Sequence, residues 1–154
     1  MIRQINDSIG ALQDSLESLL IRYQYEASKN TLVVVLDYPG KAVGADRAFL
    51  RLRFMDVLDF QRILGTFAEL QRFKESYSTR ETSATTVVQR VVVEKEANAL
   101  RITLSLGSFG ELKFGCSSLS AESRSARAKK TSENTWAYHD FDDGRIMDFY
   151  DPFA

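Results

Sequence analysis

Apolar side chains at the start of the chain recur with the period of an α-helix. They are three or four residues apart, which places them on one stripe of a helical surface. The members of this stripe are Ile2, Ile5, Ile9, Leu12, Leu16 and Leu19. The pattern predicts a helix over residues 2–15. Because Gly10 weakens a heptad seam, we expect this helix to dock on a sheet, with pairing into a homodimer as the alternative to a monomer.

Further along the chain, apolar and polar positions alternate with period two, as they do in half-exposed strands. In residues 50–54, leucine and phenylalanine point one way while two arginines point the other. The short polar turn at residues 27–30 separates two apolar runs and therefore predicts a hairpin. The predicted strands span residues 20–26, 31–38, 48–56, 86–96, 100–106 and 111–118.

Two segments between and after these strands have other patterns. Phe60, Ile63 and Phe67 begin a run with helical spacing, and Asp56 or Asp59 is available to cap it, which predicts a helix over residues 58–75. Residues 119–134 are polar and mildly basic and have no periodic apolar face. We therefore expect them to form a mobile loop.

These elements predict an α+β fold in a single domain, residues 1–154, with a meander-like antiparallel sheet of about six strands packed by an N-terminal and a central helix. The chain has 154 residues and is 44% hydrophobic, enough for one ordinary core. Its apolar runs are far shorter than the roughly 20 residues that span a bilayer, and its start lacks a basic region followed by an apolar one. The single Cys116 agrees with a reducing compartment. We expect a cytoplasmic protein with no membrane partner.

The last stretch, residues 136–153, combines aromatic rings with carboxylates. Five aspartates stand there against a single Arg145. Rings supply large apolar area at low entropic cost, and fixed carboxylates select a partner by charge, so we expect a surface that binds another protein. Its predicted residues are Trp136, Tyr138, Asp140, Asp142, Asp143, Asp148, Tyr150 and Asp151. The alternative is a structural segment that closes the sheet, with Phe141, Ile146 and Phe149 buried and the aspartates solvated.

No motif in the chain indicates catalysis or cofactor binding. His139 and Asp140 are the one place where a carboxylate could orient an imidazole, but neighbours in an extended segment point to opposite sides. A zinc site needs more nitrogen and sulfur ligands than one His and one Cys supply. Gly144 arrives one place too early for a calcium loop that begins at Asp140. Cys116 falls on an inward strand position. We expect no catalytic residue, cofactor or metal.

A basic sheet face is the second candidate surface. Arg51, Arg53, Arg90, Arg101 and Lys113 fall on outward strand positions. Such a face can hold a nucleic-acid backbone, but the aromatic platform is missing and the net charge of −1 gives no general attraction to nucleic acid. We expect no nucleic-acid partner. A nucleic-acid-associated module is the alternative function, and a hydrolase or metal-dependent enzyme at His139 and Asp140 is the third.

Several stretches carry a further pattern. They are residues 12–15 (LQDS) before a strand and short turn, residues 31–38 (TLVVVLDY), residues 50–57 (LRLRFMDV) and the later hairpin of residues 100–114. Together they resemble small bacterial immunity-type proteins that neutralise polymorphic toxins. In that family a His-Asp-Ser opens the first strand, and Gln13 stands here in place of the His. The resemblance implies a non-enzymatic inhibitor that binds a cognate toxin in the cytoplasm, and an acidic aromatic surface could fill the basic cleft of a nuclease toxin.

Overall fold

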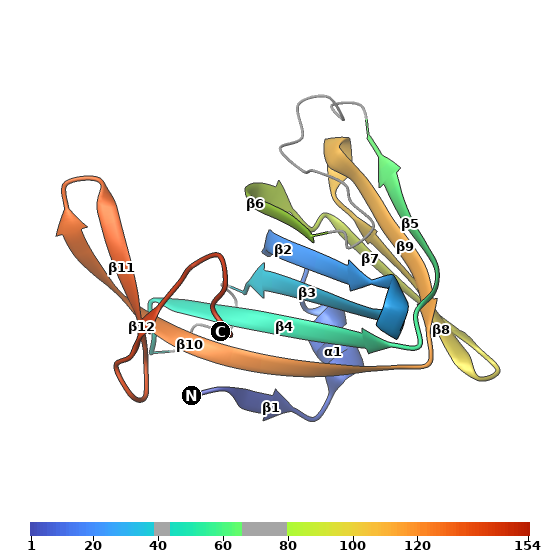
Figure 1. Ribbon diagram of the computed structural model, residues 1–154, viewed down its shortest axis with the longest axis horizontal. Coiled ribbons are helices and arrows are strands. Elements are labelled where there is room, and N and C mark those ends of the chain that lie inside the picture. The colour runs from blue at the N-terminus through green and yellow to red at the C-terminus, as the bar shows by residue number, and fades with distance from the viewer. Residues whose placement is uncertain (39–43, 66–79) are drawn as a thin grey trace.

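The computed structural model describes residues 1–38, 44–65 and 80–154, which form two antiparallel sheets and one short α-helix (Figure 1). The expected sheet-rich α+β architecture is confirmed in this coarse form. The expected number of about six strands is wrong, because the described residues contain 12 strands in two sheets. No helix among these residues has the length and apolar character needed to cross a membrane.

The larger sheet has the strand order β12-β11-β10-β4-β3-β2-β6, with β1 paired to β10. Its strands are β1 Arg3–Ile5, β2 Leu19–Glu26, β3 Thr31–Asp37, β4 Arg47–Met55, β6 Arg80–Val87, β10 Ser118–Ser132, β11 Thr135–Asp140 and β12 Ile146–Met147. The smaller sheet has the order β5-β9-β8-β7. Its strands are β5 Leu58–Leu64, β7 Arg90–Glu96, β8 Ala99–Ser105 and β9 Gly110–Cys116. The helix is α1, Ser8–Gln13.

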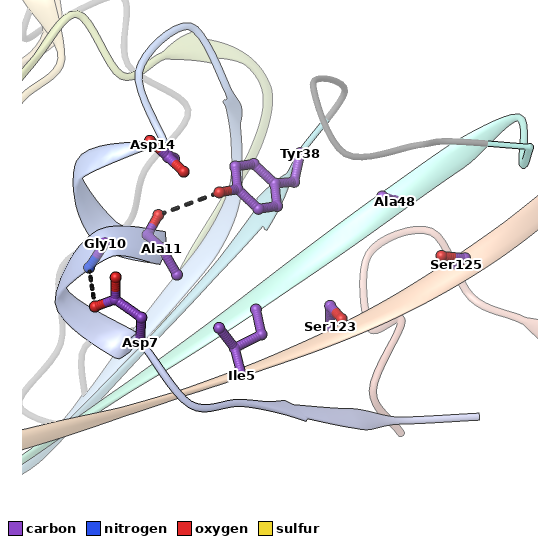
Figure 2. A pocket seen from close by; sticks show the side chains of 9 residues that line it. All are labelled: Ile5, Asp7, Gly10, Ala11, Asp14, Tyr38, Ala48, Ser123 and Ser125. Carbon is purple, nitrogen blue, oxygen red and sulfur yellow. Dashed lines mark hydrogen bonds between the residues drawn. The ribbon is translucent and has the colours of Figure 1, made fainter.

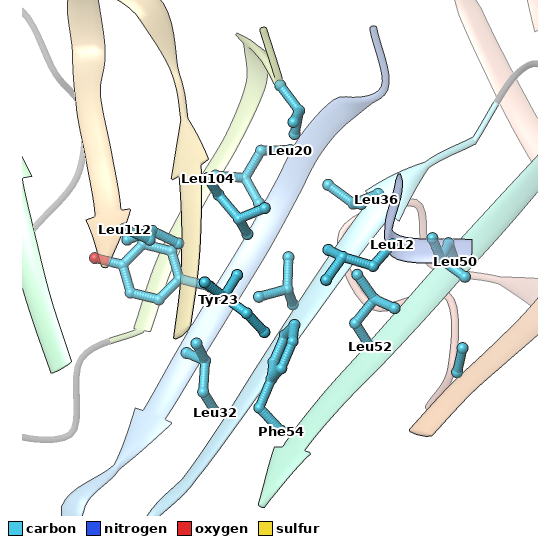
Figure 3. Packing of buried hydrophobic residues seen from close by; sticks show 14 of the residues in the cluster. Leu12, Leu20, Tyr23, Leu32, Leu36, Leu50, Leu52, Phe54, Leu104 and Leu112 are labelled. Atoms are coloured by element: carbon cyan, nitrogen blue, oxygen red, sulfur yellow. The ribbon is translucent and has the colours of Figure 1, made fainter. Parts of the chain in front are cut away.

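The main core lies between the smaller sheet, the helix and one face of the larger sheet, which we call its inner face. The alternation of β4 turns Leu50, Leu52 and Phe54 inward, and the Phe54 ring meets the Phe114 ring of β9 with centroids 4.8 Å apart. Leu12 of α1 is fully buried among the leucines of β3 and β4 (Figure 3). The N-terminal segment therefore docks on the sheet, as expected. Cys116 also lies in this core.

A smaller apolar cluster covers part of the opposite, outer face of the larger sheet. Residues 147–154, which we call the C-terminal strap, arch over β4 and β10 (Figure 1). The buried members of the cluster are Ile21, Val35, Phe49, Ala126, Met147 and Phe153. The strap thus completes a second core, and burial of each of its large side chains contributes roughly 1.5–3 kcal/mol.

The predicted N-terminal helix over residues 2–15 is much shorter in the structure. Residues 3–5 pair with β10 as β1, and only Ser8–Gln13 are helical. The side chain of Asp7 caps this helix by accepting the N–H of Gly10 at 2.9 Å. A Cβ at Gly10 would lie 2.3 Å from Asp7 Oδ2, so the glycine makes room for the cap.

The predicted helix over residues 58–75 is wrong across its first part. Residues 58–64 form β5, paired with β9, and residues 66–75 lie outside the described residues. Asp56 and Asp59, expected as helix caps, have φ values of +51° and +53°. Aspartate tolerates this left-handed region better than most residues, which suits Asp56 to the turn between β4 and β5 and Asp59 to the register shift within β5.

The predicted mobile loop over residues 119–134 is also wrong, because most of it belongs to the long strand β10. Ala121 and Ala126 are fully buried, although neither has a large apolar side chain. The predicted strand over residues 86–96 divides into β6 and β7. The other five predicted strands are confirmed to within two residues at each end.

Candidate functional site

The hairpin formed by β10 and β11 extends beyond the body of the larger sheet (Figure 1). We call residues 126–140 the arm. Trp136 and Tyr138 share its outer face, because alternate residues of a strand point the same way. Trp136 is 55% exposed, whereas Tyr138 is half-buried. The arm therefore presents a large ring to solvent on a rigid β-ribbon.

Tyr138, two residues further along the arm, packs against the C-terminal strap. Its ring centroid lies 5.5 Å from that of Phe149, which in turn lies 5.3 Å from that of Tyr150. Phe149 also packs edge-on against Phe49 of β4 at 5.9 Å. We call Trp136, Tyr138, Phe149 and Tyr150 the aromatic row. Its inner members are held against the sheet, and Tyr150 at its far end is 49% exposed.

A groove of 430 Å³ runs beside the arm end of this row. It is lined by Asp46, Arg47, Ala128, Trp136 and Tyr138. Asp46 accepts the backbone N–H of Ala128 at 2.8 Å, and Arg47 donates to Asp37 at 2.6 Å. Both charged groups are thus fixed by the protein itself. A concave surface with two rings and a few oriented polar groups suits an apolar anchor from a ligand or partner.

Asp37, at the end of β3, is buried beneath this region. Burial raises the pKa of its carboxyl group, and the Arg47 guanidinium partly offsets that effect. Its Oδ1 has no hydrogen-bond partner among the residues that the structure describes. The Asp37 carboxylate therefore holds Arg47 at the groove. The Arg47 guanidinium in turn favours the charged form of that carboxylate.

Asp140, a predicted binding residue, is buried in the protein. Its Oδ2 accepts from Arg124 Nε at 2.6 Å and contacts the N-terminal ammonium of Met1. Its Oδ1 accepts the backbone N–H groups of Asp142 and Asp143 at 2.8 and 3.0 Å. Burial alone would raise the pKa of Asp140, but these contacts hold it well below its usual range. Asp140 is therefore a structural anion that no partner can reach.

The other predicted aspartates do not form one acidic surface. Asp151 accepts from Arg22 at 2.9 Å across the outer face. Asp142 pairs with Arg3 at 3.0 Å on the turn that follows β11. Asp143 lies on that turn, and Asp148 lies in the strap, where it accepts the N–H of Tyr150 at 2.9 Å. The structure brings the rings together and separates the carboxylates.

The structure agrees in part with the alternative that residues 136–153 are a purely structural segment. Phe149 is half-buried in the second core, whereas Ile146 is 80% exposed. Four of the predicted aspartates form ion pairs within the chain instead of facing only solvent: Asp140, Asp142, Asp143 and Asp151. The C-terminal segment therefore closes the sheet and also presents exposed rings.

His139 and Asp140 point to opposite faces of β11, as the extended segment requires. His139 Nδ1 lies 3.2 Å from the carbonyl oxygen of Gly144, while Arg124 holds Asp140. The two side chains form no catalytic pair. Across the described ranges, no group of three or more His, Cys, Asp or Glu side chains could hold a metal ion.

The five basic side chains expected on one face are divided between two sheets. Arg51 and Arg53 lie on the outer face of the larger sheet, and the other three lie on the outer face of the smaller sheet. Arg51 is also paired with Glu122, with its guanidinium 4.7 Å from the centre of the Phe153 ring. No continuous basic sheet face results.

A second cavity, of 330 Å³, lies between α1 and the end of the larger sheet (Figure 2). Its lining includes Asp7, Asp14, Tyr38, Ser123 and Ser125. Tyr38 donates to the carbonyl oxygen of Ala11 at 3.5 Å. Burial, with a smaller effect from Asp14, raises the pKa of Tyr38 to about 12, so its hydroxyl group stays neutral. The oxygen atoms in this lining suit hydrogen-bond donors, while Ile5, Ala11 and Ala48 make much of the rest apolar.

The groove residues Asp46 and Arg47 were not among the predicted site residues. Asp46 directly precedes β4 and Arg47 begins it, some 90 positions before Trp136, and no sequence pattern joins them to the arm. Comparison with known proteins gives no further guide, since no family model, curated protein or solved structure matches the chain. The functional proposal therefore rests on the aromatic row, the adjoining groove and the charged side chains around them.

Proposed function

We propose that the protein is a non-enzymatic protein-binding module that recognises its partner through the aromatic row. The observation that carries this proposal is the exposure of Trp136 and Tyr150 at the two ends of a row whose inner rings are packed. Preorganised rings bury large apolar area and lose little side-chain entropy on binding. The adjoining groove offers a place for one apolar side chain of the partner.

The sharpest form of the proposal is an immunity-type inhibitor that neutralises a cognate toxin in the bacterial cytoplasm. The resemblance of the strand pattern to such proteins supports it. Asp142, Asp143 and Asp148 remain exposed and can meet a basic cleft, with Asp148 closest in sequence to the row. Asp140 and Asp151 drop out of this surface, because they are buried or half-buried and paired with arginines of the sheet.

The other two functions have less support. A nucleic-acid module that uses one arginine-bearing sheet face lacks that face, because its side chains lie on two sheets. An enzyme centred on His139 and Asp140 lacks the pairing of imidazole and carboxylate that general-base chemistry uses.

Partner capture with matched variants tests the proposal. The full chain, Trp136→Ala and Ile146→Ala would each be used to capture proteins from native lysate, with identification by mass spectrometry. Ile146 of β12 is an exposed apolar control, because it pairs with His139 and therefore lies on the sheet face opposite to Trp136. We expect one partner to be captured by the wild type and by Ile146→Ala and to be lost with Trp136→Ala.

The outcome also separates the two levels of the proposal. Capture of a toxic enzyme, followed by its inhibition by the purified protein, would support the immunity role. If Trp136→Ala captured the partner as well as the wild type does, the aromatic row would be excluded as the recognition surface. Because Trp136 is largely exposed, the unfolding midpoints of the wild type and the variant should agree, which excludes misfolding as the cause.

A further inference from the structure

Three cations on the arm have no acidic partner within the described part of the chain: Arg127, Lys129 and Lys130. The arginines on the outer face of the larger sheet differ, since four of them pair with carboxylates. These are Arg22, Arg47, Arg51 and Arg124. The whole chain has a net charge of −1. Arg127, Lys129 and Lys130 therefore place three positive charges, unpaired among the described residues, within four positions of one strand on a projecting ribbon.

These cations surround the arm instead of covering one face. Lys130 pairs in register with Trp136 and shares its face, while Lys129 and Arg127 point to the opposite face. The guanidinium of Arg127 lies 4.5 Å from the centre of the Phe141 ring, which restricts its motion. All three cations are exposed. A flat acidic surface could neutralise only one side of such a ribbon.

We propose that the arm binds double-stranded DNA by inserting into the major groove, with Arg127, Lys129 and Lys130 on the phosphates. The major groove of B-DNA is about 12 Å wide and admits a two-stranded β-ribbon. Its two walls carry rows of phosphates, so cations on both faces of the ribbon find partners. The contacts are to the backbone and position the arm without reading sequence. This activity goes beyond the proposed protein-binding function and does not depend on it.

Fluorescence anisotropy with the full chain and a labelled 20-base-pair DNA duplex tests the proposal. Three phosphate contacts predict a slope of roughly −2.7 in log K against log salt, so binding should weaken roughly 40-fold between about 50 and 200 mM salt. A triple variant, Arg127→Gln with Lys129→Gln and Lys130→Gln, should lose the binding and the slope. The matched control removes three exposed cations of the smaller sheet, by Arg90→Gln, Lys95→Gln and Lys113→Gln, and should bind like the wild type.

Three results would overturn the proposal. One is no binding at about 50 mM salt, and another is equal loss in the control variant, which would show an effect of net charge alone. The third is binding of poly-glutamate as tight as that of the duplex, which would make an acidic protein the better partner. The triple variant leaves the aromatic row intact, so protein capture by this variant tests the proposed function separately.

Discussion

Arg124 Nε donates to Asp140 Oδ2 across 2.6 Å at the base of the arm. The same guanidinium donates through Nη1 to the carbonyl oxygen of Pro152 at 2.9 Å. One buried side chain thus joins β10, the end of β11 and the strap. The surface that carries the aromatic row depends on this junction, because Tyr138 and Phe149 belong to the two segments that it ties together.

Replacement of Asp140 should therefore destabilise the whole protein. Asp140→Asn removes the anion and leaves the Arg124 charge buried without its partner, a change that typically costs about 3–5 kcal/mol. Urea denaturation measures the loss of unfolding free energy. Asp143→Asn is the control, because Asp143 is exposed and its replacement should change that free energy by no more than about 0.5 kcal/mol. Equal losses in the two variants would contradict the structural role of Asp140.

The Asp140 carboxylate also makes the stability of the folded protein depend on pH. Its pKa is lower in the folded protein than the ordinary value near 3.9, so the unfolded chain takes up the proton first as the pH falls. The stabilisation by Asp140 is full above that ordinary value and is lost as the pH falls toward its folded pKa. Urea midpoints of the wild type and Asp140→Asn should therefore converge progressively as the pH falls from about 5 toward the folded pKa. A constant difference would contradict the lowered pKa.

Asp37 should act in the opposite direction, and at higher pH. Burial raises its pKa, so the folded state binds this proton first and gains stability from it as the pH falls. The acid dependence of the wild type is then the balance of the two carboxyl groups. Asp140→Asn isolates the contribution of Asp37 in the same titration.

Within the strap, Phe153 should contribute to stability and Tyr150 to partner binding. Phe153 is 7% exposed, and Phe153→Ala should cost about 3–5 kcal/mol, the range for deletion of a buried aromatic ring. Tyr150→Ala should cost far less, because its ring is half exposed and touches the protein through Phe149. Chemical denaturation of both variants gives the comparison. Similar losses would mean that the exposed ring is structural.

Trp136 provides a direct optical report on the candidate surface, because it is the only tryptophan of the chain. At 55% exposure its fluorescence should be quenched readily by iodide in the free protein. Binding of a partner to the aromatic row should shield the indole and reduce the quenching constant. Partner binding with unchanged quenching would place the contact elsewhere.

Cys116 should be inert in the folded protein. Burial raises the pKa of its thiol to about 11, and the thiolate is the reactive form. An aromatic disulfide reagent should therefore react slowly with the native protein at neutral pH and rapidly with one thiol in denaturant. Rapid reaction of the native protein would show that β9 opens readily.

Periodic patterns predicted the elements in which the sequence alternates cleanly. Leu50, Leu52 and Phe54 occupy the inner face of β4 as the alternation requires, and Cys116 lies in the core on β9. The pattern at Phe60 and Ile63 was misleading because short apolar runs fit both periods, and pairing with β9 made it a strand.

The long strand β10 could not be recognised from its own residues. Its side chains are mostly serine, alanine and cations, and its order comes from neighbours that are far away in sequence. Ala121 lies opposite Leu52, and Ala126 lies beneath the strap, so small side chains are what these positions allow. The carboxylates of the candidate site were misplaced for a similar reason, because the partners of Asp140 and Asp151 are arginines in distant strands.

The register of β10 also has a kinetic consequence. Its residue Ser123 pairs with Leu50 on one side and with Arg3 on the other, so neighbours in the finished sheet come from almost the whole length of the chain. Closing such long loops costs entropy before any contact compensates for it. We expect slow folding, on the scale of milliseconds to seconds, in which the sheet closes and the arm becomes anchored in one late step.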